Sequence, residues 1–317
     1  MSGFLLQIIN SDFLQHIIGW LSTKGVYILQ QLINGLSIGS VYALMAVGYS
    51  LVYSIMNFSN FAHGGVIMIG SYIGFFAMTA FGMPFATAFC TAALGTALLA
   101  VLIERVAYRP LRKRNAPFLY FIISAMGISI FLENIIIASP IGPTFRTYPR
   151  VFGMEPFKVG GVNIGRLDVM MFFISTISLI ILIFIIEKTR TGMGIRASAY
   201  NLKASALMGV NTDRIILIVF GLGGLLAGIA GVLFGMKYTV YPQIGNITLK
   251  SFIAAVFGGL GSLPGAVIGS VLLGIIETFT SGYLSSQFRD LIAFVLLIFI
   301  LVVRPRGLMG KVTEDKA

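Results

Sequence analysis

The chain has 317 residues, of which 57% are hydrophobic and only 10% are charged, and its mean hydropathy is +0.95. In a soluble protein about a quarter of the residues are charged, so this composition excludes a soluble globular protein and indicates an integral membrane protein. The formal net charge of +11 does not indicate nucleic-acid binding, because the basic residues fall mostly in short loops beside apolar stretches.

Residues 1–24 are predicted to form an uncleaved amphipathic helix that lies at the membrane interface. Polar residues between Asn10 and His16 interrupt the apolar run Phe4–Leu21, and no basic segment precedes that run. The pattern therefore differs from that of a cleaved signal peptide.

Apolar stretches along the rest of the chain predict an all-α polytopic membrane protein with about 8–9 transmembrane segments, in a single domain over residues 1–317. One stretch, Leu249–Thr280, is too long for one crossing. Its centre, Gly258–Ala266, holds four glycines and a proline, which predict two short segments joined as a broken hairpin. The other predicted segments are Tyr27–Tyr53, Phe61–Phe81, Pro84–Glu104, Pro117–Ser139, Asp168–Glu187, Ile215–Gly235 and Asp290–Val303.

The placement of Lys and Arg predicts the orientation of these segments. Basic residues crowd the regions 105–114, 188–214 and 304–316, which we expect on the cytoplasmic side together with the C-terminus. The loop Pro140–Leu167 then faces outward, and its glycines and prolines predict turns or a small hairpin. Nine crossings place the N-terminus outside.

The most polar stretch between the first two segments is Asn57–Gly65. Polar groups at membrane depth are costly and usually face protein or a water-filled cavity, so Asn57, Asn60 and His63 are candidates for a transport path. The alternative is a plain loop in which Ser59 or Asn60 caps the following helix. Because no second His or Cys lies at ligand spacing from His63, no metal site is predicted.

Glycines recur at four-residue spacing, which predicts close packing between membrane helices; the alternative is that these surfaces slide during transport. The spaced glycines are Gly35/Gly39, Gly70/Gly74, Gly224/Gly228, Gly231/Gly235 and Gly261/Gly265/Gly269.

A short match between Asn57–Gly70 and Asn246–Gly259 indicates either an inverted repeat or chance.

The segment Lys188–Arg214 is a long, basic, helix-forming loop between two apolar stretches. Its alanines and the closing Gly209 predict a short helix that ends at the glycine. A small-residue helix that extends from the cytoplasmic face indicates contact with a partner protein. The chain has no phosphate-binding loop and no catalytic cluster, so any ATP hydrolysis must come from a separate subunit.

A family resemblance is carried by four long stretches in a fixed order: Asn34–Tyr72, Glu104–Arg112, Gly194–Arg214 and Lys250–Glu277. These stretches closely resemble the permease subunits of branched-chain amino-acid ABC importers, of the LivH type rather than the longer LivM type. The resemblance extends from about Leu29 to Gly310 and implies a transport subunit of the bacterial inner membrane that is not itself an enzyme.

The resemblance also implies the partners of the chain. These are a second, LivM-like permease, two cytoplasmic ATPases that hydrolyse ATP with Mg, and a periplasmic binding protein that delivers leucine, isoleucine or valine. No cofactor bound by this chain and no nucleic acid are implied. Such an amino acid needs polar contacts for its ammonium and carboxylate groups along an apolar path. We expect these contacts from the Asn57–His63 region and from Gly258, Gly259 and Gly261.

The Lys188–Arg214 loop resembles the family's ATPase-coupling segment. The general importer signature has a glutamate before its alanine pair, whereas this chain has Leu202-Lys203 there, so that signature is met only in part. The coupling role carries over to Arg196, Ala197, Ala199, Ala204, Ala206 and Gly209.

The alternative function is a stand-alone, ion-coupled secondary transporter or channel. It would use Glu133, Glu277 or His63 as the ion-coupling group, since Glu133 and Glu277 are carboxylates well inside apolar segments. The structural interpretation is that both carboxylates are hydrogen-bonded to neighbours near the outer ends of their helices. The alanine-rich cytoplasmic loop favours the importer, because a lone carrier has no use for it.

Overall fold

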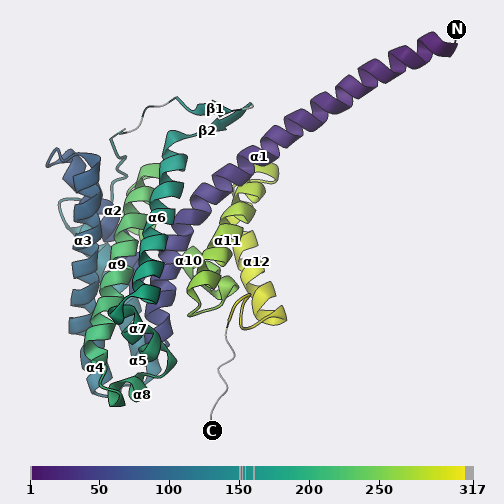
Figure 1. Cartoon of the computed structure of the whole chain (residues 1–317). Coiled ribbons are helices and arrows are strands. Elements are labelled where there is room, and N and C mark those ends of the chain that lie inside the picture. The colour runs from purple at the N-terminus through teal and green to yellow at the C-terminus, as the bar shows by residue number, and fades with distance from the viewer. Residues whose placement is uncertain (1, 150, 152, 154, 160, 311–317) are drawn as a thin grey trace.

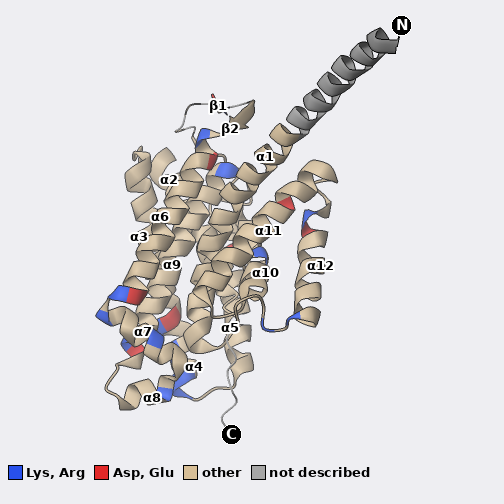
Figure 2. Ribbon diagram, turned by 45° about the vertical axis from the view of Figure 1, so that its right-hand side comes forward, with Lys and Arg blue, Asp and Glu red and all other residues tan. Residues whose placement is uncertain are grey.

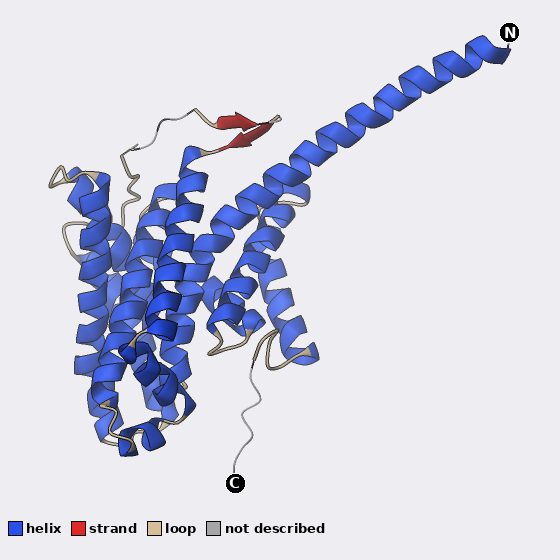
Figure 3. Cartoon of the chain, viewed as in Figure 1, coloured by secondary structure: helices blue, strands red, loops and turns tan. Residues whose placement is uncertain are grey.

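The computed structural model describes residues 2–149, 151, 153, 155–159 and 161–310, and these are almost entirely helical (Figures 1 and 3). Of residues 2–24 only the helical backbone is described, so their predicted place at the interface stays a prediction. The basic residues Lys311 and Lys316, part of the predicted cytoplasmic C-terminus, lie outside the described residues.

The elements follow one another along the chain, and the longest connection, residues 139–156, joins α5 to β1. They are α1 (Ser2–Met56), α2 (Ala62–Thr79), α3 (Phe85–Ile103), the π-helix η1 (Glu104–Tyr108), α4 (Arg109–Lys113), α5 (Phe118–Ala138), β1 (Phe157–Val159), β2 (Val162–Ile164), α6 (Arg166–Lys188), α7 (Arg190–Tyr200), α8 (Leu202–Leu207), α9 (Thr212–Lys237), the 3₁₀-helix η2 (Pro242–Ile247), α10 (Thr248–Gly258), α11 (Leu263–Tyr283) and α12 (Phe288–Val303).

Within the described residues, seven helical stretches are long and apolar enough to cross a membrane. They confirm a polytopic all-α membrane protein. The first includes Gly25–Met56 of α1, and the third runs without a break from Phe85 to Lys113 through η1 and α4. With 11 and 16 residues, α10 and α12 are shorter than the roughly 20 residues of a straight crossing.

The predicted break within Gly258–Ala266 is present. The sequence predicts one short segment on each side of this break, and the prediction is wrong for the second segment. α11 begins directly after the break and has 21 residues. Pro264 lies in its first turn, where a missing N–H costs nothing, and the Ser262 side chain caps Gly265. The proline therefore starts a full-length helix.

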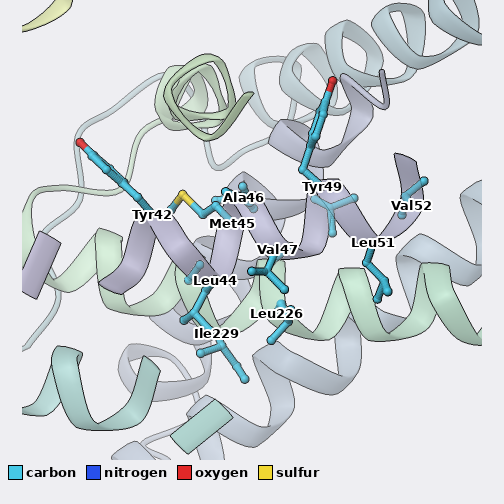
Figure 4. Packing of buried hydrophobic residues seen from close by; sticks show 14 of the residues in the cluster. Tyr42, Leu44, Met45, Ala46, Val47, Tyr49, Leu51, Val52, Leu226 and Ile229 are labelled. Atoms are coloured by element: carbon cyan, nitrogen blue, oxygen red, sulfur yellow. The ribbon is translucent and has the colours of Figure 1, made fainter. Parts of the chain in front are cut away.

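α1 is the centre of the fold, with α6 and α9 on one side and α10, α11 and α12 on the other (Figure 1). Every residue from Val41 to Val47 is at most 2% exposed. Figure 4 shows Leu44 and Val47 of α1 beside Leu226 and Ile229 of α9. A membrane helix buried on all sides must be held by protein contacts rather than by lipid.

Glycines allow the helix backbones to approach closely at these contacts. Gly48 of α1 and Gly223 of α9 face each other, and a Cβ on either would lie 3.2 Å from the carbonyl oxygen of the other. A Cβ on Gly39 would lie 2.9 Å from Cα of Val271 in α11. Gly39 is one of the spaced glycines, so close packing at this position agrees with the packing interpretation.

The loop between α5 and α6 contains the predicted small hairpin. β1 and β2 pair antiparallel, with Phe157 opposite Ile164, and Gln30 of α1 bonds the backbone of Asn163. Figure 2 shows the basic residues of α4, α7 and α8 gathered at the end of the bundle opposite this hairpin, as the predicted orientation requires. We call the hairpin end the outer end.

The two short matching segments of the sequence meet in space. A Cβ on Gly64, in the first turn of α2, would lie 2.5 Å from Oγ1 of Thr248, the first residue of α10. The two segments are therefore in contact, and the repeat itself stays a prediction.

Replacing Gly39 by alanine forces α1 and α11 apart, so we expect Gly39→Ala to destabilise the protein by about 1–3 kcal/mol. Gly25→Ala is the matched control, because no atom lies within 4 Å of a Cβ at that exposed helical position. Thermal unfolding of the purified protein in detergent measures both. Equal midpoints for the two variants would contradict the packing account.

Candidate functional site

The segment between α6 and α9 forms two helices, and the expectation of one short helix is wrong. Asn201 separates α7 from α8 because its backbone is extended and its side chain caps α8, accepting from the Ala204 N–H at 2.9 Å. Thr189 caps α7 in the same way, through the Gly192 N–H at 3.0 Å. An asparagine cap therefore turns one alanine-rich stretch into two helices.

The predicted stop at Gly209 is confirmed. The Gly209 N–H donates to the Ala206 carbonyl at 3.1 Å and the Val210 N–H to the Ser205 carbonyl at 3.0 Å, which is the Schellman pattern. Gly209 has φ +86°, a left-handed conformation that favours glycine. α9 begins three residues later, capped by the Asn211 side chain.

One face of α7 and α8 fixes the segment to the membrane helices. Ile195 is 2% exposed, and Ser198 and Ser205 are buried with their hydroxyl oxygens 3.3 Å apart. The guanidinium of Arg196 donates to the Ile186 carbonyl at the end of α6. The two short helices are therefore attached to each other and to α6.

All the residues expected to couple with an ATPase are exposed on α7, α8 or the turn that follows, although the guanidinium of Arg196 is held by the Ile186 carbonyl. The exposed residues are Arg196, Ala197, Ala199, Ala204, Ala206 and Gly209. Three large apolar side chains that the sequence analysis missed lie on the same segment: Tyr200, Leu207 and Met208 are 84–89% exposed. The signal available in the sequence was the presence of large apolar residues within a basic loop between two apolar stretches.

An ionic network with one buried member, Glu104, joins this segment to α3. Arg112 of α4 bonds Asp213, in the first turn of α9, at 2.8 Å and Glu104 of η1 at 2.9 Å. Glu104 is fully buried, and Arg109 adds a second, half-exposed bond to Asp213 at 3.1 Å. The start of α9, where the α7–α8 segment ends, is thus tied through η1 to the end of α3 opposite the hairpin.

The α1–α2 connection places two path candidates inside the protein. Asn60 is 6% exposed and accepts a hydrogen bond from the Tyr108 hydroxyl at 2.8 Å. His63 is 3% exposed, its Nε2 has no partner among the described residues, and it shares with Asn60 the lining of a cavity of about 10 Å³, near the size of one water. Asn57 is exposed, with φ +53°.

The capping alternative for Asn57–Gly65 is wrong. The residue before α2 is Phe61, and no side chain caps this helix. Asn60 instead directs its side chain to Tyr108, which explains why this polar group is stable at depth.

The candidate glycines of the α10–α11 turn lie elsewhere. Gly258 and Gly259 are buried, and the Gly258 carbonyl accepts from the Met309 N–H at 2.9 Å. The Gly261 N–H donates to Ser50 Oγ at 3.0 Å. A Cβ on Gly261 would also lie 3.7 Å from Cα of Ser54, one turn before Asn57, so this turn packs on the end of α1 that leads into the other candidate region. No hydrogen bond among the described residues joins the turn to Asn57–His63 itself.

The two intramembrane carboxylates differ. Glu277 is 3% exposed, accepts from the Tyr42 hydroxyl at 2.8 Å and pairs with Lys250 at 2.9 Å, and Lys250 also pairs with Asp290. Glu277 therefore fits the structural interpretation. Glu133, half-buried on α5, makes no hydrogen bond or ion pair with the described residues.

The sequence matches a family of known permeases over nearly its whole length. Residues 31–301 match the family model described as branched-chain amino acid transport system / permease component. The chain is 42% identical to the high-affinity branched-chain amino acid transport system permease protein BraD of Pseudomonas aeruginosa, over 91% of this chain and 97% of the relative.

Two further relatives are permease proteins named LivH. The high-affinity system's LivH of Escherichia coli K12 is 40% identical, over 93% of this chain and 100% of the relative. A probable LivH of Methanocaldococcus jannaschii is 30% identical, over 86% of this chain and 89% of the relative.

Arg112→Ala leaves the buried Glu104 carboxylate without its charge partner, so we expect it to lower the free energy of unfolding by about 3–5 kcal/mol. Arg109→Ala is the control, since its half-exposed pair contributes at most about 1 kcal/mol. Denaturant unfolding in detergent compares them, and adding Glu104→Gln to Arg112→Ala should recover part of the loss. Equal losses for the two arginines would contradict the buried network.

Proposed function

The chain belongs to the family of permease components of branched-chain amino-acid transport systems, and on this premise we propose how it works. It is a permease component of a high-affinity branched-chain amino-acid ABC transport system, without an ATPase domain of its own. We propose that it lies in the bacterial inner membrane with its C-terminus in the cytoplasm. There it carries leucine, isoleucine and valine as an importer subunit.

Four other proteins would complete the importer. A second, LivM-like permease would share the translocation path, two cytoplasmic ATPases would hydrolyse ATP with Mg, and a periplasmic binding protein would deliver the amino acid at the outer end. This chain would hold no cofactor itself.

The observation that carries this proposal is the open face of α7 and α8. Tyr200, Leu207 and Met208 would enter an apolar groove of one ATPase, while Ala204 and Ala206 let the backbone of α8 approach it closely. Buried apolar anchors surrounded by small and polar residues are typical of energetically important contacts. Lys203 adds positive charge at the rim.

Movement of the ATPases must reach the membrane helices, and the ionic network supplies a rigid route. A movement of α8 would displace the start of α9. The ion pairs of Arg112 with Asp213 and Glu104 would then transmit this displacement to η1 and α3. Glycine contacts between α9 and α1 would then let the helices shift with little steric hindrance. Domain closure transmitted by packed helices is a common form of switching.

The path for the amino acid would be mainly apolar. We propose that Asn57, Asn60 and His63 line or gate it, because an ammonium and a carboxylate need brief polar contacts in crossing. Gly258, Gly259 and Gly261 would act at a separate place, where they set the mobility of the α10–α11 turn against Ser50.

To test the coupling role, we would replace both Ala204 and Ala206 by Asp, which puts two charges on the docking face. We expect uptake to fall at least about tenfold, while insertion and assembly stay normal, because an unpaired charge in an interface costs several kcal/mol. Asn115→Asp, on another exposed cytoplasmic loop, is the control. Gly209→Glu should also lower uptake, but the left-handed φ at this position strains a glutamate. The double variant at Ala204 and Ala206 therefore tests docking more selectively. Unchanged ATP-dependent leucine uptake in the alanine variant would remove this assignment.

The ion-coupled alternative makes the opposite prediction for the carboxylates. We expect Glu277→Gln and Glu133→Gln to lower uptake by less than about threefold, because the amide keeps the Tyr42 hydrogen bond and no proton relay is needed. Uptake by proteoliposomes at several external pH values measures this. Complete loss with normal assembly, or uptake driven by a proton gradient without ATP, would favour the lone transporter.

A further inference from the structure

An apolar groove opens near the outer end of the protein, between α2, α3 and α5. It has a volume of about 370 Å³. Its floor is a single face of α2, whose lining residues recur at the three- and four-residue spacing of a helix. These floor residues are Ile69, Tyr72, Ile73, Phe76 and Ala77.

The two walls of the groove come from helices that both pack on α2. Thr91 lies on the α3 side and Ile136 on the α5 side. All three helices are membrane spans, so the groove faces the acyl chains of the outer leaflet rather than water. A groove of this kind fits an extended hydrocarbon chain.

The rim of the groove carries a positive charge. Arg146 donates to the carbonyl of Ile141 at 2.7 Å, and its guanidinium carbon lies 5.4 Å from the centre of the Phe76 ring; Ile141 and Phe76 both line the groove. Arg146 forms no ion pair with any described residue. Its charge is therefore available to an anion at the level of the lipid headgroups.

Tyr72 lines the floor of the groove without offering it a polar group. The residue is 2% exposed, and its hydroxyl, which has no hydrogen-bond partner within the described part of the chain, is buried away from the groove. The floor therefore presents an apolar surface that suits an acyl chain.

We propose that this groove binds one anionic phospholipid of the outer leaflet, with an acyl chain along α2 and the phosphate at Arg146. The charge at the rim selects an anionic headgroup, and the apolar floor selects a chain rather than a free phosphate or an amino acid. The bound lipid fills the space between α3 and α5, which pack on α2 but leave the groove open between them.

Native mass spectrometry of the assembled importer tests the site without any need for transport. The complex is taken from phosphatidylcholine vesicles that contain a minor share of phosphatidylglycerol, and the retained phosphatidylglycerol is counted. Arg146→Gln removes the rim charge and Thr91→Trp fills the groove. Arg166→Gln is the first control, because Arg166 also lies over an aromatic ring at the outer surface, 5.4 Å from Phe157.

Thr87→Trp is the control for the groove. Thr87 and Thr91 are both exposed on α3 and both donate to the carbonyl three residues before, but only Thr91 lines the groove.

We expect Arg146→Gln to lower retention of phosphatidylglycerol about fivefold, the weakening expected for one basic residue at an anionic lipid surface. Thr91→Trp should abolish it, and the two controls should bind as the wild type does. The proposal is overturned if both arginine variants, or both threonine variants, behave alike. It is also overturned if Thr91→Trp alone separates the second permease, because a partner helix would then occupy the groove.

Discussion

Close backbone contact at glycines is the constraint on which this structure depends. Inside a bilayer, helices gain nothing from burying apolar side chains against each other rather than against lipid, so they must approach closely to be held together. Gly48 with Gly223, and Gly39 with α11, bring α9 and α11 against α1 on two sides. Because α1 is held in this way, the short helices and loops that carry function have fixed places around it.

Buried polar groups add specific ties at the two ends of the bundle. Near the outer end, Lys250 and Glu277 join α10 to α11, and Tyr42 adds α1. Near the inner end, Arg112 joins η1 and α4 to the start of α9. The inner tie lies beside the proposed ATPase contact, which makes the start of α9 the point where a cytoplasmic movement would enter the membrane domain.

The sequence was sufficient for features that depend on local composition. Apolar length located the membrane helices, and the left-handed Gly209 was predicted as a helix stop. It was not sufficient where side chains decide the outcome: Asn201 divides one predicted helix into two, and Asn60 bonds Tyr108 instead of capping α2. The Arg112–Asp213 pair joins residues 101 positions apart, and no local pattern reveals such a contact.

The exposed apolar residues of α7 and α8 show the same limit. The basic composition and the alanines of the segment Lys188–Arg214 identified it from the sequence. The exposure of Tyr200, Leu207 and Met208, however, depends on which face of α7 and α8 packs against α6 and α9, and only the structure shows this.

Leucine uptake into proteoliposomes tests the central claim most directly, with this chain, its partner permease and the two ATPases in the membrane, binding protein outside and ATP inside. The account predicts uptake that stops when ATP, the ATPases or the binding protein is left out. Uptake by this chain alone under an ion gradient would contradict it.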